Sequence, residues 1–212
     1  MSVGTQSGRE VLNRTQRRAS RTRKRLLDAA MAMFREKGVD ATTIEDITER
    51  ADVGKGTFYR HFANKEAVVV ALAEDVLAGL MEQIRASERP GRTLEGVLED
   101  LVQVHVRFFA EHPDEFVLLF RGRMLMKLRR NEPVTVEEPL VGYLDEIQHQ
   151  VVPHVAPPVD PGKVRRLAYA LAGFVSGFFS FATLGIGSDE IERTLGPLRH
   201  AFVAGASAFL KR

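Results

Sequence analysis

Apolar side chains recur along most of the chain at the three- and four-residue spacing of α-helices, and the alternation expected of a strand is nearly absent. The first 87 residues are therefore predicted to form four helices. The first has the apolar face Leu26, Leu27, Ala30 and Phe34 and ends at Gly38; the second covers 43–51, with Thr43 as its N-cap; the third is a short helix over 55–62; and the fourth covers 64–87.

The rest of the chain continues the same pattern after the linker "ERPGRT". Each later break contains proline, glycine or an acidic cap, and the chain shows no internal repeat and no sustained heptad pattern. The expected fold is all-α with about nine helices. The later helices are predicted at about 93–111, 113–130, 134–152, 161–185 and 188–210.

Charge is unevenly distributed. Residues 1–65 carry 14 Lys and Arg against 8 Asp and Glu, and the remainder carries 16 against 20, so the net charge of +2 combines a basic beginning with a mildly acidic body. A basic region of this kind suits a polyanionic partner. From charge alone, a solvated basic tail explains the pattern equally well.

The basic beginning is densest from Arg14 to Arg25, where seven Arg and Lys residues occur without an acid. Such a segment cannot bury enough apolar surface to fold alone, so we expect it to be disordered in isolation and residues 1–19 to form a flexible basic arm. Arms of this type follow phosphates or enter a minor groove once DNA is present.

The composition also limits the chemistry. The chain has no cysteine, which excludes disulfides and thiolate metal sites, and its first residues lack the apolar run of a signal peptide, which favours a cytoplasmic location. The pairs His105/His112 and His149/His154 lack the spacing of a helical metal pair, and neither a nucleophile elbow nor a cofactor loop occurs. We expect no metal, no cofactor and no enzymatic activity; a histidine-based effector site for a metal is an open alternative.

The stretch "GKGTFYRHF" has two possible functions. A phosphate-binding P-loop needs a glycine five residues before Gly54, where Glu49 stands, a Ser or Thr after Lys55, where Gly56 stands, and a preceding strand. The alternative is the second helix of a helix-turn-helix, with Phe58 and Phe62 as apolar anchors behind a polar, basic and aromatic face. The P-loop fails on three counts, and a plain capping helix over a core also stays open.

The string "TTIEDITERADVGKGTFYRHFANKEAVVV" closely resembles the N-terminal DNA-binding domain of the tetracycline-repressor (TetR) family of bacterial transcription regulators. The resemblance covers about residues 20–72. Asp52 stands where the family usually has glycine, in a turn that can require positive φ, and Gly54 stands where Ser or Thr is common. The matching residues are Thr42, Thr43, Ile44, Ile47, Ala51, Val53, Gly56, Thr57, Phe58, Tyr59, His61, Phe62, Lys65 and Glu66.

The resemblance implies roles for residues in and around this helix-turn-helix. Phosphate contacts orient such a helix on DNA and base contacts give specificity. We expect the Gly56 backbone, Thr57 and Arg60 to lie nearest base edges. Phosphate contacts are expected mainly from Thr43, Lys55, Tyr59, His61 and Lys65, and the basic Arg21, Arg23 and Lys24 together with Gly54 at the helix start complete the expected DNA-binding set.

The segment 167–188 has no charge over 22 residues and contains Gly173 and Gly177 at GxxxG spacing. By length it suits either a membrane span or a bundle core with a subunit interface. The resemblance implies the second: a homodimer through the last two long helices, with no membrane contact, bound to a pseudo-palindromic operator in double-stranded DNA. The resulting domains are 20–66 for DNA binding and 67–212 for ligand binding and dimerisation.

The resemblance places an effector pocket in helices 93–185. Apolar walls with a few polar groups suit a largely hydrophobic small molecule, and plain core is the alternative for each candidate. The candidates are His105, Phe109, Phe116, Phe120, Met124, Tyr143 and Phe178.

The expected function is a sequence-specific DNA-binding transcriptional regulator, a repressor released by a small-molecule ligand. The alternatives are a nucleoid-type DNA binder, which would show little sequence preference, and an enzyme with an accessory helix-turn-helix, which would require a catalytic constellation.

Overall fold

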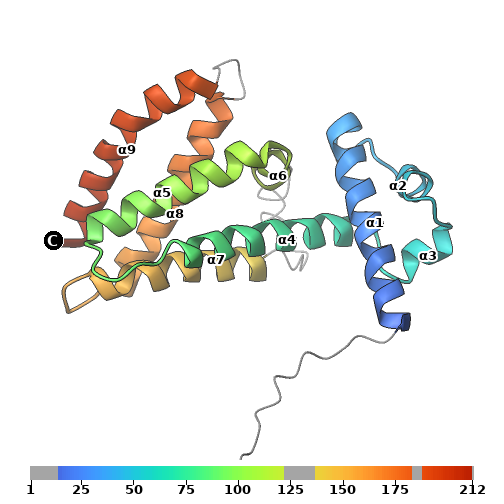
Figure 1. The fold of residues 1–212 in the computed structure, drawn as a ribbon, viewed down its shortest axis with the longest axis horizontal. Coiled ribbons are helices and arrows are strands. Elements are labelled where there is room, and N and C mark those ends of the chain that lie inside the picture. The colour runs from blue at the N-terminus through green and yellow to red at the C-terminus, as the bar shows by residue number, and fades with distance from the viewer. Residues whose placement is uncertain (1–13, 122–136, 183–187, 212) are drawn as a thin grey trace, which may run out of the picture. The chain divides into compact units, whose positions relative to one another are not determined.

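The computed structural model describes residues 14–121, 137–182 and 188–211, and every regular element within these ranges is helical (Figure 1). The all-α prediction is therefore confirmed. The chain divides into two compact units, one ending at Leu72 and the other beginning at Ala73. Each unit has a hydrophobic core of its own.

The first unit is built around a small group of fully buried apolar side chains. Leu26 and Ala30 of the first helix, Ile47 of the second and Phe58 of the third have no exposed surface. These residues belong to the apolar faces read from the sequence, so burying them holds three helices together. The helices are α1 (Arg14–Lys37), α2 (Ile44–Arg50), α3 (Lys55–Tyr59) and the beginning of α4 (Lys65–Ala86).

Helix α1 begins earlier than the sequence suggested. It starts at Arg14, although its first buried side chain is Leu26, so the basic segment expected to lack structure in isolation forms the first turns of the helix. The cost of nucleating a helix is met by the packed part of α1, and arginine is a good helix former, so the helix propagates toward the N-terminus.

Among the described residues, the second unit contains the rest of α4 and five further α-helices. Helix α5 lies against α7, α8 and α9, and α8 also contacts α7 and α9. The core residues Leu98, Leu101, Ile147 and Leu171 are fully or almost fully buried. The helices are α5 (Leu94–Glu111), α6 (Pro113–Phe116), α7 (Glu137–Val151), α8 (Pro161–Ala182) and α9 (Ser188–Lys211).

The predicted helix 113–130 is helical as far as the structure describes it, to Arg121. Helix α6 ends at Phe116 and continues as a π-helical segment, Val117–Arg121, and residues 122–136 lie outside the described part of the chain. Wider π-helical turns do not follow the 3.6-residue period on which the prediction relied. The 134–152 helix is observed as α7, followed by a 3-10 turn over Val152–His154.

Three phenylalanines from different elements meet in the core of the second unit. The ring of Phe109 lies 5.4 Å from that of Phe116 and 6.1 Å from that of Phe179, and the rings of Phe116 and Phe179 are 5.3 Å apart. Phe109 and Phe116 are each 1% exposed. Phe109 meets the other two rings edge to face, and such contacts add to the free energy gained by burying the rings.

Replacing Phe116 with alanine should therefore lower the free energy of unfolding by about 3–5 kcal/mol, because the substitution leaves a cavity among packed rings. The neighbouring Val117 is 40% exposed, and Val117→Ala should change the free energy of unfolding by less than about 1 kcal/mol. Urea unfolding followed by circular dichroism measures both. Equal losses in the two variants would contradict the central place of Phe116.

Candidate nucleic-acid interface

Helices α2 and α3 form a compact pair joined by a tight turn. Ile47 and Phe58 are completely buried, and the Phe58 ring lies 5.9 Å from that of Phe62. The turn is closed by a hydrogen bond of 3.0 Å from the Val53 amide to the Thr48 carbonyl. Two short helices with a buried side and a tight turn are the arrangement of a helix-turn-helix.

The turn contains one residue in the left-handed region, Asp52, at φ 50°. This is where the sequence departs from the glycine usual in similar proteins, and aspartate is one of the few other residues that tolerate this conformation. Arg25 of α1 donates hydrogen bonds to the carbonyl of Ala51 and, at 3.3 Å, to that of Asp52. Arg25 thus fixes the turn to α1. The sequence did not indicate this role, because the two carbonyls lie 26 and 27 positions away.

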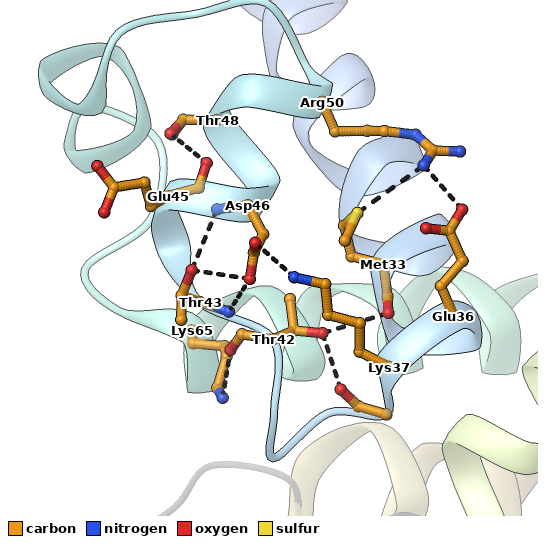
Figure 2. Close-up of polar contacts among 11 residues, drawn as sticks. Met33, Glu36, Lys37, Thr42, Thr43, Glu45, Asp46, Thr48, Arg50 and Lys65 are labelled. Carbon is orange, nitrogen blue, oxygen red and sulfur yellow. Dashed lines mark hydrogen bonds and ion pairs between the residues drawn. The ribbon is translucent and has the colours of Figure 1, made fainter.

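The start of α2 is held by a capping box. The Thr43 hydroxyl accepts from the Asp46 amide at 3.1 Å, and the Asp46 carboxylate accepts from the Thr43 amide at 2.9 Å and hydroxyl at 2.8 Å (Figure 2). Lys37 of α1 donates to the other oxygen of Asp46 at 2.6 Å. The hydrogen bond from Lys37, followed by those from Thr43, lowers the pKa of Asp46 to about 2. At the start of α2, the Thr43 hydroxyl and both oxygens of the Asp46 carboxylate therefore already have hydrogen-bond partners within the chain.

Further polar contacts join α1 to α2. Arg50 at the end of α2 forms an ion pair of 2.7 Å with Glu36, and the buried Thr42 hydroxyl lies 2.7 Å from the carbonyl of Gly38 and 3.2 Å from that of Met33 (Figure 2). Gly38 itself has φ 80°, as a helix-ending glycine requires. These contacts set the direction in which α2 leaves α1.

Lys65, expected to contact phosphate, points to backbone oxygens in this structure. Its ammonium group donates to the carbonyls of Val39 at 2.7 Å, Asp40 at 3.2 Å and Thr42 at 2.7 Å. An ammonium group has three protons, and this arrangement supplies one carbonyl for each. Lys65 therefore fastens the connection between α1 and α2 to the start of α4.

Helix α3 and the residue after it present a polar and aromatic surface. Lys55, Tyr59 and Arg60 are exposed, with 57% of Tyr59 accessible, and Thr57 is half-buried. Lys55 pairs with Glu45 of α2 at 2.8 Å, and hydrogen bonding to that carboxylate raises the pKa of Lys55. Arg60 donates to the Thr57 hydroxyl at 3.0 Å. The side chains expected near base edges thus lie together.

Gly54 and Gly56 leave the start of α3 uncovered. Gly54 is the N-cap in an extended conformation and makes no side-chain cap. A Cβ atom added at either glycine would meet nothing within 4 Å. Neither glycine is required by packing within the described residues, which agrees with an approach to this backbone from outside the chain.

His61 lies beside two cations. It is half-buried, and its burial, followed by the charges of Arg60 and Arg23, lowers its pKa. The Arg23 guanidinium lies 5.3 Å from the centre of the Phe62 ring. Of the other predicted contacts on α1, Arg21 is exposed and Lys24 is exposed and paired with Asp28 at 3.0 Å.

The family model for bacterial regulatory proteins of the tetR family matches residues 26–72, the part of the chain that contains this helix-turn-helix. The chain belongs to the tetR family.

Individual relatives agree with this assignment. The uncharacterised regulator YvdT of Bacillus subtilis is 28% identical over 60% of this chain and 66% of its own length. The repressor KstR2 of Mycobacterium tuberculosis is 41% identical over 30% of each chain. The chain thus spans less than two thirds of either relative. The fatty acid degradation regulator FadR of Bacillus halodurans shares the fold with a TM-score of 0.70, at 19% identity, over 86% of this chain and 94% of its own.

In the second unit of this tetR-family chain, two of the predicted effector-site residues form a buried pair. His105 is fully buried and Tyr143 is 2% exposed. His105 Nδ1 lies 2.6 Å from the Leu101 carbonyl, which can only accept, so Nδ1 carries the proton and Nε2 accepts from the Tyr143 hydroxyl at 2.8 Å. Burial lowers the pKa of His105 to about 4 and raises that of Tyr143, so both stay neutral near pH 7.

The structure brings some other predicted effector-site residues close to this pair. The Phe109 ring lies 6.5 Å from that of His105 and 5.4 Å from that of Phe116. Phe178 is half-buried and contacts Phe179, with 6.0 Å between ring centres. Phe120 lies in the π-helical segment, but its side chain and the whole of Met124 lie outside the described part. Their role in an effector pocket stays a prediction.

None of the helices within the described residues is long and apolar enough to cross a membrane. The uncharged segment 167–188 is represented in this result by α8 and the first residue of α9, because residues 183–187 are outside the described ranges.

The contacts of Lys65 generate a test of its structural role. Lys65→Met removes three charge-assisted hydrogen bonds and should lower the free energy of unfolding of the first unit by about 1.5–3 kcal/mol. Lys55→Met, which removes a lysine from an exposed ion pair, should have a much smaller effect. Thermal unfolding of the two variants measures the difference. Unchanged stability of Lys65→Met would contradict the fastening role.

Proposed function

We propose that this chain is a sequence-specific DNA-binding transcriptional regulator that acts as a repressor and is released from DNA by a small-molecule effector. The observation that supports this most directly is the helix-turn-helix within residues 26–72, which exposes Lys55, Tyr59 and Arg60 on α3 and the residue after it. A short helix anchored by apolar residues, with basic and aromatic side chains outward, suits the DNA major groove. The proposed DNA-binding domain is 20–66, and the proposed location is cytoplasmic.

A homodimer through α8 and α9 is part of the proposal. Each helix has a face of exposed small or apolar residues, and the rings of Phe174 on α8 and Phe202 on α9 stack 4.6 Å apart and join the two helices. Exposed apolar faces on two neighbouring helices favour a second subunit. The exposed residues are Tyr169, Ala170 and Gly173 on α8 and Leu198, Ala201, Ala204, Gly205, Ala208 and Phe209 on α9.

The effector is proposed to be largely hydrophobic and to bind within residues 67–212. The aromatic side chains Phe109 and Phe116 supply apolar surface, and His105 and Tyr143 supply the polar groups that orient a ligand. Helix α4 belongs to both units and is the proposed route of coupling. The effector must bind the DNA-incompetent state better than the competent one, because only a difference in affinity shifts the population. Regulation by binding requires no catalysis.

Selection of bound sequences from random duplex DNA tests the function. A dimer with two recognition helices should enrich a pseudo-palindrome whose half-sites lie about one helical turn apart. Binding without any enriched sequence would support a nucleoid-type DNA binder and overturn the proposed function.

The exposed residues of α3 and the turn after it should divide between specificity and affinity. Arg60→Ala should change the base preference at one position of each half-site, at a cost of about 1–3 kcal/mol for the preferred base, because arginine reads base edges. Lys55→Ala should weaken binding to all sequences by a similar factor, because phosphate contacts carry no sequence information. Repeating the selection with both variants compares them. A uniform loss in Arg60→Ala would contradict its base contact.

His61 should make DNA binding depend on pH. Burial, Arg60 and Arg23 lower its pKa in the free protein, and a phosphate beside it would raise that pKa in the complex. Binding then takes up a proton, so affinity should rise as pH falls from 8 to about 6 and level off below the free-protein pKa. Fluorescence anisotropy at constant salt should show a flatter profile for His61→Gln. The exposed His149 serves as control: His149→Gln should retain the parent profile. An unchanged profile in His61→Gln would rule out its phosphate contact.

A further inference from the structure

The first turns of α1 form a basic extension that packs on no core of its own. Residues 14–21 are all exposed, and the first buried side chain of the helix is Leu26. Within Arg14–Arg25 there are seven Arg and Lys residues and no acid. The extension is therefore a charged helical surface.

Six of these cations share one side of the helix. With successive residues about 100° apart, they fall within an arc of roughly 120° that is opposite to Leu26, Ala30 and Met33. The side of the extension that continues the core-facing direction carries Thr15 and Ala19 and offers little apolar surface for packing against protein. We call the row formed by these six cations the α1 stripe. Its residues are Arg14, Arg17, Arg18, Arg21, Lys24 and Arg25.

The α1 stripe is fixed to the helix-turn-helix at the C-terminal end of the stripe. Arg25 donates to the carbonyls of Ala51 and Asp52 in the turn that precedes α3. On the core side of the same helix, Arg23 stacks over Phe62, in the turn after α3. Contacts on both sides of the helix therefore set the rotation of α1 about its axis, and with it the direction of the stripe.

The arrangement is electrostatically unfavourable without a polyanion. Arg14 and Arg18, and likewise Arg17 and Arg21, are like charges four residues apart on a helix, which repel. The first turn contains no acid, so the positive end of the helix dipole adds to the repulsion. From Arg14 to Arg25 the helix rises about 16 Å, a length over which one DNA strand presents about five phosphates.

We propose that the α1 stripe binds the phosphate backbone of DNA flanking the bases read by α3, as an ordered helix that strengthens binding to every sequence equally. This rests on the proposed function, because it assigns a second surface of the same first unit to the same DNA. It differs from a flexible arm that reads the minor groove, since the stripe is a rigid helical face of long cations with no sequence information in its contacts.

The test is the salt dependence of DNA binding by the double variant Arg17→Gln/Arg21→Gln in the full-length chain. Glutamine keeps a polar, unbranched side chain and a similar helix propensity while removing the charge. Each lost phosphate contact lowers the slope of log affinity against log salt by about 0.9, and a dimer loses four contacts, two in each subunit, so the slope should fall by about 4. Between 50 and 200 mM salt the variant dimer should lose about a hundredfold less affinity than the parent, for a selected operator and for random duplex alike.

The matched control is Arg107→Gln/Arg166→Gln, which removes two exposed charges from the second unit and should leave the slope unchanged. A slope equal to the parent's in Arg17→Gln/Arg21→Gln, with unchanged helix content by circular dichroism, would overturn the proposal. An altered base preference in a repeated selection would also overturn it, in favour of minor-groove reading. Because the slope is measured on random duplex as well, it tests the stripe even if no palindrome is enriched.

Discussion

The complete burial of Phe58 is the constraint on which the DNA-facing side of this chain depends. Helix α3 spans only Lys55–Tyr59, which is far too short to be stable by its own hydrogen bonds. Its conformation exists because Phe58 packs in the same core as Ile47 of α2 and Leu26 of α1. Since Phe58 is turned inward, its neighbours Thr57 and Tyr59 are turned partly or fully outward. The exposed side of the helix is thus a consequence of its buried side.

Polar contacts then define the direction of each helix around that core. Arg25 holds the turn at Asp52, the Thr43 and Asp46 capping box starts α2, and Lys65 fastens the connection that precedes it. Each of these joins residues at a backbone carbonyl or a helix end, where unsatisfied groups are otherwise costly. The acids near α2 also neutralise lysines of the neighbouring helices, whereas the first turns of α1 carry cations without an acid among them. Positive charge without a neighbouring acid is therefore concentrated on the first turns of α1.

In the second unit, unlike the first, the polar contact of greatest interest lies inside the apolar core. Its core is one cluster, mainly of aliphatic side chains with a few aromatic rings, and within it His105 and Tyr143 form a hydrogen bond without an ionised group. A neutral, hydrogen-bonded pair can be buried at little cost. The Tyr143 oxygen can still accept a hydrogen bond from a ligand, whereas the protons of the pair become available only if one of its present bonds is exchanged.

Much of the fold was predictable because helical periodicity is a local property. The sequence correctly predicted the limits of α2 and α5 to within about one residue, the Gly38 stop and the unusual conformation of Asp52, since caps and left-handed turns depend on neighbouring residues. It did not indicate the wider helical turns of Val117–Arg121 or the extension of α1 to Arg14, beyond the apolar face of that helix.

By itself, the sequence determined the all-helical fold, the family and the segment that forms the helix-turn-helix. Only the tertiary structure decided that Arg25 clamps the turn, that Lys65 serves three carbonyls and that His105 meets Tyr143. The physical reason is distance along the chain. These partners lie between 23 and 38 positions apart, so no local pattern records them, and packing alone brings them together.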